Sequence, residues 1–139
     1  MRPKRPFGVT LLAWAVIILA VLNLIRMEQA LAQWQFLAGL LPVSPVYLAL
    51  SGLVWGLAGL PLAWGIWRGK SWAPAWTVAG ILAYSLYFWL DRLLLEGYPG
   101  RNIDWIFWAV FNAIFFLWSL ATLRSKGARM YFSKPISQN

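Results

Sequence analysis

The stretch VYLALSGLVWGLAGLPLAWGIW, residues 46–67, runs for 22 residues without a charged side chain. At 1.5 Å per residue, a helix of this length extends about 33 Å, enough to cross the roughly 30 Å hydrocarbon core of a bilayer. Three further uncharged stretches of 19 residues are also long enough, at 7–25, 72–90 and 105–123. Because lipid offers no partner for an open backbone group, each stretch is expected to be helical. The sequence predicts an all-α integral membrane protein with four transmembrane helices.

The composition supports this prediction. The chain has 139 residues, of which 61% are hydrophobic, 17% aromatic and 12% charged, with 11 Trp. Soluble domains carry about 25% charged residues. The length matches one compact domain covering 1–139. The net charge of +8 is interpreted as charge flanking the spans, and no nucleic-acid partner is expected.

Two residue types that carry much protein chemistry are missing from the sequence. It has no Cys and no His, which removes disulfides, thiol redox relays, imidazole ligation of haem and the usual zinc sites. A Ser-His or Cys-His nucleophile is excluded as well. We therefore expect no enzyme activity, no metal site and no cofactor.

The basic residues are distributed unevenly about the four spans. With four crossings, nine of the 12 Lys and Arg residues fall on the side of the two termini and the 68–71 turn, and only Arg26, Arg92 and Arg101 on the other. All four acidic residues share that second side. By the positive-inside rule, both termini are expected in the cytoplasm.

Two segments outside the spans carry patterns of their own. In 27–41 the apolar residues follow 3/4 spacing while Glu28 and three Gln residues avoid most of that face, which predicts an extra interfacial helix between helices 1 and 2 or a short cap on the bundle. The segment 124–139 has four basic residues among Met130, Tyr131 and Phe132. It is expected to be a basic cytoplasmic tail on the anionic leaflet, with docking to a partner as the alternative.

Small residues recur along one face of the second span at 3-4-3-4 spacing, namely Ala49, Gly52, Gly56, Gly59 and Ala63. Such a face lets a second backbone approach closely. It predicts either helix packing within the chain or an interface with a partner subunit. The fourth span has a bulky aromatic stripe, at Trp105, Trp108, Phe111 or Asn112, Phe115 and Trp118, interpreted as packing against protein or lipid rather than as a ligand platform.

Polar residues inside the spans are few and gather toward the acidic side. Tyr84, Tyr87 and Asp91 are spaced 3 and 4 and so share one helix face, and Asn112 is expected at the depth of Tyr84. These residues form a candidate outer polar pocket, with Arg26 and Arg101 nearby, whose members are Asn23, Glu28, Tyr84, Tyr87, Asp91, Arg92 and Asn112. The alternative is that the charges are solvated at headgroup level and Asn112 bonds across helices.

Two segments, RPFGVTLLA at 5–13 and GLPLAWGIWRGKSWA at 59–73, resemble a loose group of small, uncharacterised prokaryotic four-helix membrane proteins. The resemblance implies the topology and a prokaryotic inner membrane, and carries over no functional residue. Abundant packing surface with little chemistry favours an accessory or assembly subunit of a larger membrane complex. The alternative is a homo-oligomeric carrier, channel or lipid-binding protein that uses the outer pocket. The expected partners are membrane lipids and other membrane subunits or copies of this chain.

Overall fold

The computed structural model describes residues 4–40, 44–94 and 105–133, and every regular element in these ranges is an α-helix. The helices are α1 (Phe7–Ala32), α2 (Trp34–Leu40), α3 (Pro45–Arg68), α4 (Ala73–Leu94), α5 (Trp105–Arg124) and α6 (Lys126–Phe132). Four of them, α1, α3, α4 and α5, are long and apolar enough to cross a membrane. The predicted all-helical fold with four candidate spans is confirmed.

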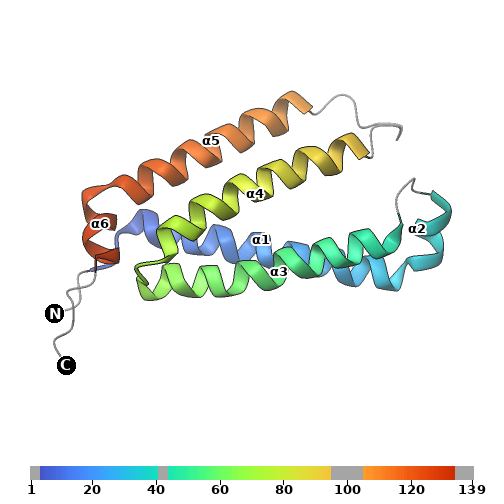
Figure 1. Cartoon of the computed structure of the whole chain (residues 1–139), viewed down its shortest axis with the longest axis horizontal. Helices are drawn as coiled ribbons and strands as arrows, with labels where there is room; N and C mark the ends of the chain where they lie inside the picture. Colours follow the sequence, from blue (N-terminus) through green and yellow to red (C-terminus); the bar gives the residue numbers. More distant parts are fainter. Residues whose placement is uncertain (1–3, 41–43, 95–104, 134–139) are drawn as a thin grey trace.

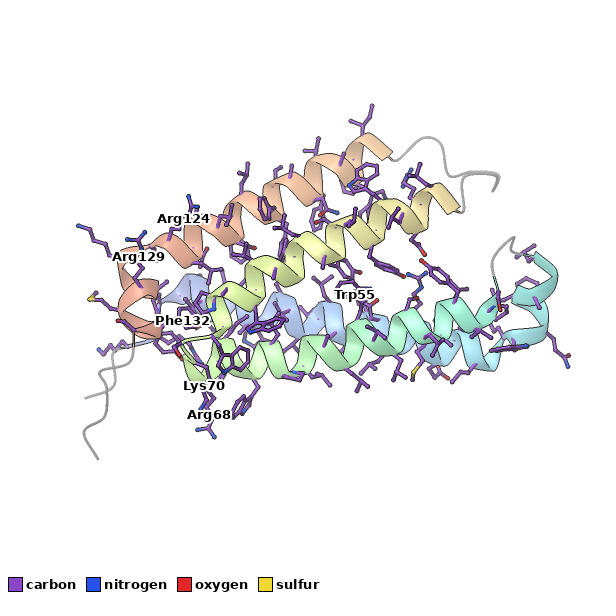
Figure 2. All side chains as sticks on the ribbon, in the orientation of Figure 1. Trp55, Arg68, Lys70, Arg124, Arg129 and Phe132 are labelled. Atoms are coloured by element: carbon purple, nitrogen blue, oxygen red, sulfur yellow. The ribbon has the colours of Figure 1, made fainter. Side chains whose placement is uncertain are left out.

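The four long helices lie side by side, and the short helices mark the two ends of the bundle (Figure 1). α6, the start of α1 and the α3–α4 turn lie at one end, called here the basic end. Figure 2 shows Arg68, Lys70, Arg124 and Arg129 there. α2 marks the opposite end, called the α2 end. α3 ends and α4 begins at the basic end, where the two helices lie close together, and they diverge toward the α2 end (Figure 1).

The tightest packing in the molecule joins α1 to α3. A Cβ built on Gly52 would lie 2.5 Å from the backbone oxygen of Asn23, and one on Gly59 would lie 2.8 Å from the Cβ of Ala20. The small-residue face predicted from the sequence therefore packs on α1, with Ala49 and Ala63 also buried. Of its two expected uses, packing within the chain is the one present in this structure.

α4 and α5 are covered much less. Only 17% of the α4 span and 11% of the α5 span is buried, against 33% for α1 and 28% for α3. The bundle thus consists of a closely interlocked pair, α1 and α3, and a lightly packed pair, α4 and α5.

The basic end is closed by contacts among three segments. Gly69 ends α3 in the left-handed region, with φ of 66°. Behind it the Tyr131 hydroxyl of α6 donates a hydrogen bond to the Trp67 carbonyl, and the Arg5 guanidinium lies 3.6 Å above the Trp67 ring centroid. Phe132 is buried in the main core. The segment 124–139, expected as a surface tail, thus includes a helix docked on the bundle; residues 134–139 lie outside the described ranges.

The interfacial helix expected over 27–41 is divided in the structure. α1 continues without a break to Ala32, and after Gln33 the separate helix α2 covers 34–40. α1 continues because no Gly or Pro interrupts it and because Met27 and Ala30 extend its contact with α3. Among the described residues of 27–41, a helix separate from α1 is therefore formed only by α2.

Candidate functional site

An ion pair joins two helices near the α2 end. Nη2 of Arg26, on α1, donates to Oδ1 of Asp91, on α4, at 3.0 Å. The Asp91 side chain is 8% exposed and that of Arg26 is 31% exposed. The carboxylate is thus enclosed, while the Arg26 side chain is partly exposed.

Four aromatic rings form a connected group beside the ion pair. Tyr47 and Trp55 come from α3, and Trp55 lies between α3 and α4 (Figure 2). The Trp55 ring centroid is 4.9 Å from that of Tyr84 and 5.4 Å from that of Tyr87. The ring centroids of Tyr47 and Tyr87 are 6.5 Å apart. The Tyr47 hydroxyl lies near the Asp91 carboxylate. The Arg26 guanidinium also lies 5.9 Å from the Tyr87 ring centroid.

Helical spacing explains why these side chains converge. Tyr84, Tyr87 and Asp91 lie on one face of α4, and Asn23 and Arg26 are three residues apart on α1. On α3, Tyr47 and Trp55 are eight residues apart and so return to the same face. The three faces meet in what is called here the α2-end cluster: Asn23, Arg26, Tyr47, Trp55, Tyr84, Tyr87 and Asp91.

Asn23 links α1 to α4 through a hydrogen bond in the α2-end cluster. The Asn23 amide donates to the Leu19 carbonyl at 2.8 Å and to the Tyr84 hydroxyl at 3.4 Å. Among the described residues, the Tyr87 hydroxyl is the one buried side-chain polar atom without a hydrogen-bond partner. A buried hydroxyl without a partner is costly, and native proteins contain few of them. Tyr87 therefore has an unused donor and acceptor beside an ion pair.

The structure assembles part of the predicted outer pocket. Asn23, Tyr84, Tyr87 and Asp91 come together as expected. Asn112 does not join them, because its side-chain oxygen accepts a hydrogen bond from the Ser85 hydroxyl at 2.7 Å.

The other two predicted members of the outer pocket are Glu28 and Arg92. Glu28 is exposed on α1, and Arg92 is half-buried on α4, one residue after Asp91.

Sequence reasoning missed two cluster residues and underused a third. Tyr47 and Trp55 lie in the second span, where the small residues alone were used for prediction. Their eight-residue spacing places both on one helix face and would have indicated them. Arg26 was expected only as a neighbour of the pocket, yet it shares a face with Asn23. Within the described part of the chain, no group of three or more His, Cys, Asp or Glu side chains could hold a metal ion.

No family model, curated protein or solved structure matches this chain.

Proposed function

We propose that this protein is a multi-pass protein of a prokaryotic inner membrane, with both termini in the cytoplasm, and acts as a non-enzymatic accessory or assembly subunit of a larger membrane complex. The membrane assignment is supported by the four long apolar helices. The orientation is supported by the nine-to-three distribution of basic residues in the sequence.

The uneven packing of the bundle carries the subunit proposal. α5 is only 11% buried in its span, and its uncovered surface includes Phe107 at 64% and Phe111 at 52% exposure. These rings are ordered against each other: Phe107 stacks on Phe111 at 6.4 Å, and Phe111 on Phe115 at 6.5 Å. Stacked rings offer a large, rigid contact area at low cost in side-chain entropy, which suits a protein partner.

The first test is purification of the tagged protein from its native membranes in mild detergent, followed by native mass spectrometry. We expect stoichiometric partner subunits. Replacing Phe107 and Phe111 together by Ala should remove them, because the stacked surface is lost. The matched control is Leu50→Ala with Val54→Ala, which trims exposed apolar side chains on α3 instead. A wild-type protein that leaves native membranes as a single lone species would refute the subunit role.

The homo-oligomeric carrier or channel is less well supported by the geometry. Transport needs polar groups along the path, but Thr77 and Ser119, buried toward the basic end, donate their hydroxyls to carbonyls of their own helices. The α2-end cluster favours instead the lipid-binding part of that alternative.

A further inference from the structure

We propose that the α2-end cluster binds a phosphate–ammonium zwitterion, the group that zwitterionic phospholipids and free phosphoamines share. This inference goes beyond the accessory role and rests only on the membrane assignment made under the proposed function. Its basis is the combination of a partly exposed arginine side chain, a buried hydroxyl without a hydrogen-bond partner and a group of aromatic rings at one position.

The position matches the depth of a lipid headgroup. Arg26 is 19 residues beyond Phe7 on α1, which places it about 28 Å along the helix axis at 1.5 Å per residue. The hydrocarbon core of a bilayer is about 30 Å thick, with polar headgroups immediately beyond. The ion pair therefore lies where the phosphates of the leaflet at the α2 end are found.

Arg26 and Tyr87 supply the donors that a phosphate needs. A guanidinium has five N–H donors in a planar fork and can serve two anions from different edges. Arg26 directs Nη2 to Asp91, and 31% of its side chain remains exposed. The Tyr87 hydroxyl is buried without a hydrogen-bond partner, and its ring lies 5.9 Å from the guanidinium. A phosphate oxygen that reached both groups, once the side chains covering the hydroxyl moved aside, would satisfy that hydroxyl.

Charge balance selects a zwitterion over a simple anion. Asp91 carries a negative charge beside Arg26, so a phosphate diester alone would add a second negative charge next to this carboxylate, which is unfavourable. A ligand that brings its own ammonium balances the charge of its phosphate. The rings of Tyr47, Trp55, Tyr84 and Tyr87 provide the π surfaces that attract organic cations, and Asp91 adds a negative charge behind them.

The experiment uses the full-length chain, purified and delipidated in detergent. Native mass spectrometry measures binding of short-chain phosphatidylethanolamine, of short-chain phosphatidylglycerol with the same acyl chains, and of free phosphoethanolamine. We expect phosphatidylethanolamine to be retained at least fivefold over phosphatidylglycerol. Binding of phosphoethanolamine alone would identify a soluble zwitterion as the ligand, and binding only of the lipid would identify the headgroup. Equal retention of the two lipids would overturn the proposal.

Tyr87→Phe tests whether the binding occurs at this cluster. It removes one hydroxyl that has no hydrogen-bond partner, so the delipidated variant should unfold at the same temperature as the wild type or higher. If the hydroxyl donates to a phosphate, phosphatidylethanolamine affinity should fall about tenfold. Tyr131→Phe is the matched control: it removes a hydroxyl at the basic end that is bonded to Trp67, so it should leave the lipid affinity unchanged.

Arg26→Lys is a second variant that keeps the positive charge beside Asp91 but loses the planar fork. It should also lower the affinity for phosphatidylethanolamine while the helical circular dichroism spectrum stays as in the wild type. Unchanged affinity in both folded variants would remove the ligand from this cluster.

Discussion

Gly52→Ala should separate α1 from α3, because the added methyl group meets backbone rather than a movable side chain. The new Cβ would lie 2.5 Å from the Asn23 oxygen and 2.9 Å from the Met27 nitrogen, whereas ordinary contact begins at 3.4 Å. The helices must therefore move apart by about 0.9 Å at this point (3.4 minus 2.5). Overpacking of this kind costs about 1–3 kcal/mol, partly offset by about 0.5–1 kcal/mol from replacing Gly by Ala in a helix. The expected net loss is about 1–2 kcal/mol.

Gly80→Ala on α4 is the matched control. Its Cβ would meet only the Leu62 Cδ2, at 3.5 Å, which is an ordinary contact. The same chemical change should therefore leave the free energy of unfolding unchanged or raise it slightly. The assay is reversible unfolding in mixed detergent micelles, followed by circular dichroism. If the two variants were equally stable, the close α1–α3 contact at Gly52 would be wrong.

Three further changes test other parts of the bundle. In a double-mutant cycle of Arg26→Gln and Asp91→Asn, unfolding free energies should show a coupling of about 1–2 kcal/mol; additive values would mean that the ion pair contributes nothing. Gly69→Ala should lower the unfolding free energy by about 1–2 kcal/mol, because only Gly adopts the left-handed conformation without strain; wild-type stability would contradict the turn. Ser85→Ala should cost about 0.6 kcal/mol through the lost bond to Asn112, and a loss above about 2 kcal/mol would show a larger role.

The helices and the tight seam could be predicted because both depend on local patterns. Uninterrupted apolar length defines the spans, and the spacing of Gly52, Gly56 and Gly59 defines one flat face whatever the helix packs against. The identity of the facing helix could not be predicted. It depends on which helices become neighbours, and the structure assigns α1, whose small residue Ala20 meets Gly59.

The candidate site was harder to predict because it depends on how each helix is rotated about its own axis. Depth alone placed Asn112 with Tyr84, but Asn112 faces Ser85, which is about 100° further around α4. From the sequence, Arg26 is expected near the pocket but not as one of its members. Its partnership with Asp91, 65 residues later in the chain, becomes visible only when α1 and α4 are placed together.

The seam and the α2-end cluster form one structural unit, since Asn23 belongs to both. Its backbone oxygen lies against Gly52 in the seam, and its side-chain amide donates to Tyr84 in the cluster. The position of the cluster on α1 is therefore fixed by the closest helix contact in the molecule. The stacked rings of Phe107 and Phe111 are on α5, a helix that contributes no residue to the cluster. A partner bound at α5 and a zwitterion bound at Arg26 would thus use different helices. A variant that loses one of these two binding activities should therefore keep the other.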